Sequence, residues 1–186
     1  VPSRKGFAMI VFVTGGTGTI GTAVVAELLT HGHSVLALAR SDDSATALRA
    51  VGADVLRGSL ADLDVLRAGA SRADGVISLA FSRDYGSAEA LDRGLAEERE
   101  AMATLGGALI GTGKPIVTVS GTPWVPGRAA TESDPLPLEG PVASRAFAVT
   151  ALLDLSARGV RASAVRMPRT VHEGGEGGFA GLLAAA

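Results

Sequence analysis

The chain has 186 residues, of which 47% are hydrophobic and 19% charged, and this composition is typical of one globular domain with a sizeable core. A formal net charge of -2 gives no indication of a nucleic-acid or anionic-membrane partner. The absence of cysteine excludes disulfides and thiolate chemistry, and no cluster of His, Asp and Glu has metal-ligand spacing. No apolar run approaches the roughly 20 residues of a membrane-spanning helix. We therefore expect a cytoplasmic protein.

The two ends of the chain carry different signals. Residues 1–8 include basic side chains but no long apolar run, so they do not form a signal peptide. Met9 is typical of a natural start, so we expect 1–8 to be an arm or a cloning remnant and 9–186 to form the domain. Residues 181–186 have the composition of a helix opening, which suggests that the native chain continues past Ala186.

Short β-branched segments alternate with helical patterns along nearly the whole chain. The expected elements, in chain order, are strand 9–14, helix 20–31, strand 34–39, helix 43–51, strand 54–57, helix 62–69, strand 75–81, helix 87–110, strand 115–120, helix 142–157 and strand 161–167. The strands show little polar alternation, which is typical of burial on both faces. Strands alternating with helices through short loops predict an α/β fold with a doubly wound parallel sheet.

A glycine-spaced turn joins the first expected strand to the first expected helix. Gly15, Gly18 and Gly21 stand at G-x-x-G-x-x-G spacing. The first glycine permits a sharp turn, the second lets the backbone approach a pyrophosphate, and the third lets the helix pack close to the sheet. Amide groups and the dipole at the helix start favour anionic phosphates. The strand, the helix and the spacing together predict a dinucleotide site.

The end of the second expected strand bears on the choice of cofactor. Arg40 and Ser41 stand there, where an NAD-specific site would place a carboxylate against the ribose 2′-hydroxyl. A guanidinium binds a 2′-phosphate well, so these residues favour NADP, with NAD as the alternative. Asp42 and Asp43 follow directly, and either carboxylate could pair with Arg40 and weaken this effect.

Two further features are visible in the second half. The expected helix 87–110 carries apolar residues at spacings of three and four, which form one stripe along the helix. Glu98 is the charged residue within this series, and we expect the stripe to pack on the sheet. The Pro-rich loop 122–141 follows a strand end, where long loops are often functional. Phe81, Trp124 and Val125 suggest an apolar ligand, although Trp124 could equally anchor the loop.

With these residues, the chain resembles the short-chain dehydrogenase/reductase superfamily, in its extended and atypical branch of NAD(P)-dependent epimerase/dehydratase-like proteins. The resemblance extends from Met9 to about Phe179 and implies a Rossmann-type fold whose C-terminal substrate lobe is missing or truncated here. Besides Arg40 and Ser41, it implies these cofactor-binding residues: Gly15, Thr17, Gly18, Thr19, Ile20, Gly21, Ser59, Leu60, Leu79, Ala80 and Phe81. Ser59 stands where the family usually has an acidic residue at the adenine, and Asp62 is more simply a helix N-cap.

The resemblance also identifies candidate catalytic residues at the end of the fifth strand. Thr122 aligns best with the family's catalytic Ser or Thr, and Ser120 is second. Either hydroxyl could instead satisfy backbone groups at a turn. The family's Tyr-x-x-x-Lys motif falls on Pro141 and Arg145. Arg145 can supply positive charge and ribose hydrogen bonds, but it cannot shuttle protons.

The proton donor must therefore lie elsewhere if the protein is an enzyme. Tyr85, the only tyrosine, follows the fourth strand, and His172 follows the sixth strand and can titrate near neutrality. Both side chains could instead be ordinary surface groups, with Tyr85 covering the cleft.

Three interpretations remain. The retained hydroxyls favour an NAD(P)(H)-dependent oxidoreductase acting on a small carbonyl or alcohol substrate. The first alternative is a non-catalytic NADP(H)-binding sensor or scaffold, and the second is the same fold without a dinucleotide. From the family pattern we also expect a homodimer face on helices 87–110 and 142–157.

Overall fold

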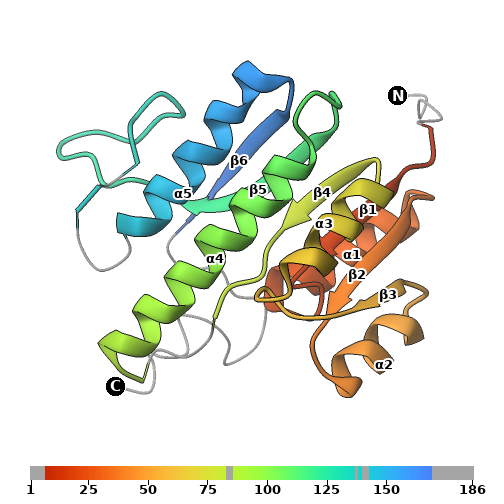
Figure 1. Cartoon of the computed structure of the whole chain (residues 1–186). Coiled ribbons are helices and arrows are strands. Elements are labelled where there is room, and N and C mark those ends of the chain that lie inside the picture. Colours follow the sequence, from red (N-terminus) through yellow and green to blue (C-terminus); the bar gives the residue numbers. More distant parts are fainter. Residues whose placement is uncertain (1–6, 83–85, 137, 140–142, 169–186) are drawn as a thin grey trace.

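The computed structural model describes residues 7–82, 86–136, 138–139 and 143–168. A parallel sheet with strand order β3-β2-β1-β4-β5-β6 forms its centre (Figure 1). The strands are β1 (Ile10–Thr14), β2 (Ser34–Ala39), β3 (Asp54–Arg57), β4 (Gly75–Ser78), β5 (Pro115–Gly121) and β6 (Arg161–Met167). The helices are α1 (Thr19–Thr30), α2 (Asp42–Ala50), α3 (Leu63–Arg72), α4 (Ala88–Ala108) and α5 (Ala143–Asp154), with a 3-10 turn η1 (Leu155–Arg158). The predicted Rossmann-type fold is confirmed.

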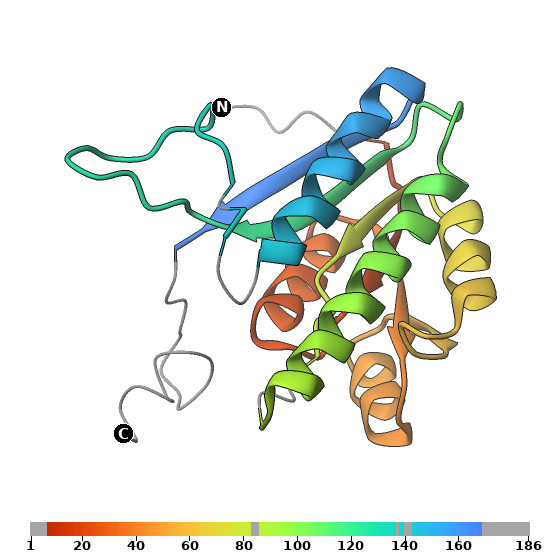
Figure 2. The same cartoon turned by 60° about the vertical axis from the view of Figure 1, so that its left-hand side comes forward.

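Helices cover the sheet from two sides (Figures 1 and 2). Because side chains alternate along a strand, β1 contributes to both layers. Val11 and Val13 pack in one cluster with Val25 of α1 and residues of α2. Phe12 points the other way, into a larger cluster with Leu66 of α3 and residues of α4 and α5. Buried apolar residues on both faces explain why the strand sequences lack polar alternation.

The fourth strand is shorter than predicted. The sequence predicted a strand over 75–81, but β4 ends at Ser78. At the end of β1, the backbone carbonyl of Thr14 accepts from the Leu79 amide at 3.2 Å, and the Thr14 side chain adds further contacts just beyond β4. The Thr14 hydroxyl oxygen accepts from the amides of Leu79 at 3.2 Å and Ala80 at 3.3 Å. Leu79–Phe81 are thus placed in a loop above the sheet edge, and not within the sheet.

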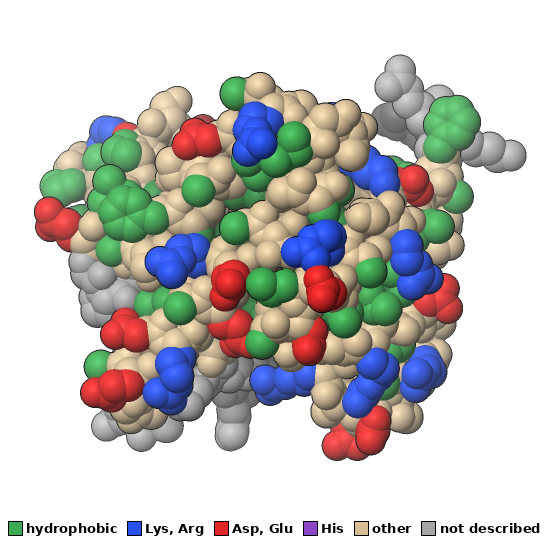
Figure 3. Space-filling view, in the orientation of Figure 1, with side chains coloured by type: hydrophobic (Ala, Val, Ile, Leu, Met, Phe, Trp, Pro, Cys, Tyr) green, Lys and Arg blue, Asp and Glu red, His purple; other side chains and the backbone are tan. Residues whose placement is uncertain are grey.

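The described residues carry no helix that is both long enough and apolar enough to cross a membrane. Acidic and basic side chains are interspersed over the helical face in Figure 3. Most of the arm 1–8 and the segment after Pro168 lie outside the described residues, so the predicted domain boundaries stay predictions.

The closest packing of helix on sheet gives a stability prediction. A Cβ on Gly69 of α3 would lie 2.5 Å from the ring of Phe12, which is fully buried. We expect Gly69→Ala to lower the free energy of unfolding by about 1–3 kcal/mol through overpacking, as measured by urea denaturation.

Gly107 of α4 is the matched control, because a Cβ there meets nothing within 4 Å. Gly107→Ala should stabilise by up to about 1 kcal/mol, since alanine is the better helix former. Equal effects of the two substitutions would contradict the close contact between α3 and β1.

Candidate nucleotide site

A pocket of about 460 Å³ lies at the carboxyl ends of strands β1 to β4. Four loops supply most of its lining: the turn after β1, the end of β2, the loop after β3 and the loop after β4. Its lining residues are Gly15, Thr17, Gly18, Thr19, Ile20, Gly21, Leu38, Arg40, Ser44, Gly58, Ser59, Leu60, Leu79, Ala80, Phe81, Ser82 and Glu97. The carboxyl edge of an open parallel sheet is the general place for a ligand in such folds.

The turn after β1 requires glycine for two measurable reasons. Gly15 has φ of +74°, and a Cβ on it would lie 2.7 Å from the amide nitrogen of Ala80. A Cβ on Gly21 would lie 2.0 Å from the carbonyl oxygen of Gly15, so any side chain there would displace the turn. The turn can therefore approach the loop after β4 and the start of α1 only because both residues lack side chains.

The start of α1 is suited to an anion. Its N-cap residue, Gly18, makes no side-chain capping bond, and the first turn holds no acidic residue. No carboxylate of this turn therefore competes with a phosphate for the amide groups and the positive end of the helix dipole. The amide of Gly18 is already bonded to the Gly15 carbonyl at 3.0 Å, so the amides of the following residues are the ones that face a ligand.

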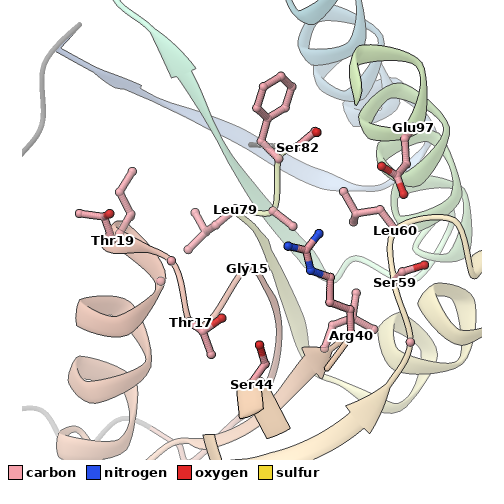
Figure 4. A pocket seen from close by; sticks show the side chains of 17 residues that line it. Gly15, Thr17, Thr19, Arg40, Ser44, Ser59, Leu60, Leu79, Ser82 and Glu97 are labelled. Carbon is pink, nitrogen blue, oxygen red and sulfur yellow. The ribbon is translucent and has the colours of Figure 1, made fainter. Parts of the chain in front are cut away.

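Arg40 extends into the pocket from the end of β2, with Ser59 and Leu60 on one side and Thr17 on the other (Figure 4). The carboxylate of Asp42 is held 3.0 Å from a guanidinium nitrogen of Arg57. Among the described residues no ion pair involves Arg40. The sequence raised the possibility that Asp42 or Asp43 pairs with Arg40, and neither pair is present among the described residues.

Ser41 does not line the pocket. Its hydroxyl oxygen accepts from the amide of Ser44 at 3.2 Å and so caps α2. The side chain that does line the pocket is Ser44, one turn into the helix. Ser41, which was predicted to bind the cofactor, is thus a helix cap. Ser44 is the better candidate for a ligand contact.

The loop after β3 is fixed by Asp62. Its carboxylate accepts from the Ser59 amide at 2.7 Å and from the Ser59 hydroxyl at 2.8 Å. These hydrogen bonds hold the pKa of Asp62 below its usual value. Asp62 occupies the predicted N-cap position of α3, although its side chain makes no capping bond to the helix. The carboxylate instead orients Ser59 at the pocket.

Arg145 lies behind the pocket wall and does not line the pocket. Its Nε donates to both carboxylate oxygens of Glu98, at 3.0 and 2.9 Å, and its Nη2 donates to the Val119 carbonyl at 3.4 Å. The guanidinium also lies over the ring of Phe81, 4.9 Å from its centroid. Burial raises the pKa of the Glu98 carboxyl, and the neighbouring Arg145 acts in the opposite direction.

The two hydroxyls at the end of β5 do not line the pocket either. The Thr122 hydroxyl donates to the Met167 carbonyl at 3.0 Å, so its only proton is used in joining β5 to β6. Within the described part of the chain, no hydrogen bond of the Ser120 hydroxyl distinguishes a catalytic role from a structural one. Tyr85 and His172, the predicted proton donors, lie outside the described residues, as does Pro141. The described catalytic candidates are therefore not assembled around the pocket.

The loop after β5 is tied down by arginines. Arg166 of β6 donates to the carbonyls of Thr131 at 2.9 Å and Asp134 at 2.6 Å. Arg128 pairs with the Asp134 carboxylate within the loop and, with backbone and hydroxyl donors of Thr131, lowers its pKa strongly. Trp124 at the start of the loop is 76% exposed.

Five lining residues were missed from the sequence, namely Leu38, Ser44, Gly58, Ser82 and Glu97. Gly58 and Ser82 adjoin predicted residues, so extending each expected strand end by one residue would have found them. The alternation of side chains along β2 would have found Leu38, two residues before Arg40. Glu97 comes from α4, and no local pattern indicates that this helix passes the pocket. Within the described part of the chain, no group of His, Asp and Glu could hold a metal ion.

Comparison with known proteins agrees with this geometry. The model of the NmrA-like family matches residues 8–95, which supply every lining residue except Glu97. Two uncharacterized proteins, from Saccharomyces cerevisiae and Schizosaccharomyces pombe, are 36% and 39% identical to the chain over 94% of its length. The chain spans 58% of the length of each of these relatives.

Among solved structures, a short-chain dehydrogenase/reductase superfamily protein from Agrobacterium tumefaciens with bound NAD has a TM-score of 0.67. It is 24% identical, and the match covers 84% of this chain and 48% of that one. The strand order and this match show the fold of the short-chain dehydrogenase/reductase proteins, and the first half of the chain matches the NmrA-like family.

Proposed function

We propose that the protein binds a nicotinamide dinucleotide in this pocket, with the diphosphate at the amides that begin α1. The observation that carries the proposal is the turn from Gly15 to Gly21. Neither of these two glycines has room for a side chain, and the helix that follows begins with neither a capping side chain nor an acid. The pocket continues from this turn along the ends of β2, β3 and β4, which suits a long ligand with two ends. The related protein with bound NAD supports the same ligand class.

The preferred nucleotide in this proposal is NADP(H). Arg40 points into the pocket at the end of β2, and no ion pair among the described residues involves it, since the adjacent Asp42 contacts Arg57. A guanidinium without an acidic partner suits a 2′-phosphate, which a carboxylate at this position would repel. Ser44 adds a hydroxyl on the same side.

The proposed activity is that of an oxidoreductase on a small carbonyl or alcohol substrate. The bound nucleotide would supply or accept the hydride, and the chain would supply the proton through Tyr85 or His172. Thr122 is less suited to giving a proton, because its hydroxyl proton is engaged with the Met167 carbonyl. The second candidate is a binding protein without turnover, which the replacement of the Tyr-x-x-x-Lys residues by Pro141 and Arg145 favours.

Removal of the Arg40 charge tests the nucleotide preference. We expect Arg40→Ser to raise the Kd for NADPH at least about tenfold, because one charge-assisted contact to the 2′-phosphate is lost. The Kd for NADH should change by less than about twofold. Arg49→Gln is the control, since Arg49 is an exposed arginine of the last turn of α2 that does not line the pocket. Calorimetry on the full-length protein measures both constants, and equal losses for the two nucleotides would contradict the preference.

Turnover separates the oxidoreductase from the binding protein. We expect the full-length protein to consume NADPH, followed by its absorbance, with at least one member of a panel of aldehydes and ketones. Tyr85→Phe or His172→Ala should reduce the rate by about 100-fold or more, as expected for loss of the proton donor, without a matching change in NADPH affinity. Tight NADPH binding with no consumption across the panel would instead favour the sensor or scaffold.

A further inference from the structure

An ion pair lies directly behind the wall of the pocket at the end of β4. Glu98 of α4 is almost completely buried, with its side chain 4% exposed, and Arg145 of α5 contacts it at 2.9 Å. The side chain of Arg145 is 28% exposed, so this arginine is also largely removed from solvent. A carboxylate on the buried stripe of a helix is costly unless it is paired, which explains why these two residues occur together.

The pair ends on an aromatic residue of the pocket. The guanidinium of Arg145 lies over the ring of Phe81, and Phe81 lines the pocket while Arg145 and Glu98 do not. Attraction between a cation and a ring face favours one ring orientation over others. Both carboxylate oxygens of Glu98 accept from the Nε of Arg145, so the position of the guanidinium is itself fixed.

The position of Phe81 along the pocket identifies the half of the ligand that it contacts. If the 2′-phosphate lies at Arg40 and the diphosphate at the turn after β1, then the adenosine half covers β2 and β3. The sheet order places β4 on the other side of β1, so the loop after β4 faces the nicotinamide half.

We infer that Glu98 and Arg145 are positioning residues that hold Phe81 in the pocket wall and thereby set the affinity for the nicotinamide half of the dinucleotide. The inference rests on the proposed function. It gives Arg145 a different task from ribose binding, because its Nε and Nη2 are already bonded to Glu98 and the backbone.

Two ligands distinguish this positioning effect from a general loss of structure. NADPH contains both halves, whereas adenosine 2′,5′-bisphosphate contains only the adenosine half with its 2′-phosphate. We expect Glu98→Gln to raise the Kd for NADPH about tenfold and to leave the Kd for the bisphosphate within about twofold, as measured by calorimetry on the full-length protein. Arg145→Lys should act in the same direction, because an ammonium lacks the planar fork that meets both the carboxylate and the ring.

A double-mutant cycle tests whether the effect passes through Phe81. Phe81→Leu should weaken NADPH binding by a similar factor, and adding Glu98→Gln to that variant should cause less than about a further twofold change. Arg67→Gln is the matched control, since it removes the exposed pair between Arg67 and Asp64 of α3. It should leave both constants unchanged.

Several outcomes overturn the inference. Equal loss of affinity for NADPH and the bisphosphate would show a general structural effect, and additive effects of Glu98→Gln and Phe81→Leu would show that the pair does not act through the ring. If Glu98→Gln fails to fold, Arg145→Lys in the same cycle decides the question. A wild-type protein that binds NADPH, with a Kd that Glu98→Gln and Arg145→Lys leave unchanged, would refute the inference alone, whereas a wild-type protein that does not bind NADPH would refute the proposed function with it.

Discussion

The close approach of β1 and β4 at their carboxyl ends is the constraint on which the rest of the site depends. Thr14 is fully buried, and its hydroxyl oxygen accepts from the two amides that follow β4. Gly15 then turns with a positive φ so near to Ala80 that a side chain is excluded. These contacts bend the chain away from the sheet on both strands at once, so the turn before α1 and the loop after β4 become two walls of one pocket.

The other walls are held by polar contacts that the pocket itself does not use. Asp62 fixes Ser59 through two hydrogen bonds, Ser41 caps α2 so that Ser44 faces the pocket, and Arg57 binds Asp42 beside Arg40. In each case a residue outside the lining contacts a lining residue or its neighbour, and Ser41, Asp42 and Asp62 are themselves exposed. A ligand would thus meet side chains and amides whose positions are set before it binds, which reduces the entropy lost on binding.

Much of the fold and half of the site could be predicted because their causes are local. The apolar strand Ile10–Thr14, the glycine spacing and the alternation of strands with helices are all properties of short segments, and the predicted sheet and glycine turn followed from them. The end of β4 was wrong because Thr14 lies far away in the sequence. The role of Glu98 could not be predicted for the same reason. The local pattern shows it only as a charged residue within an apolar stripe, and its partner Arg145 is 47 residues away.

In the proposed function, this division between local and long-range causes is also a division between nucleotide binding and chemistry. The side of the pocket proposed for the nucleotide is built from the segment between β1 and β4, most of which carries local sequence signals. The β4 to β6 side depends on pairs that join distant segments, such as Thr122 with Met167 and Glu98 with Arg145. Breaking a buried ion pair by removing one partner typically costs about 3–5 kcal/mol. Glu98 and Arg145 therefore depend on each other, and together they join α4 and α5 beside Phe81 in the wall of the pocket.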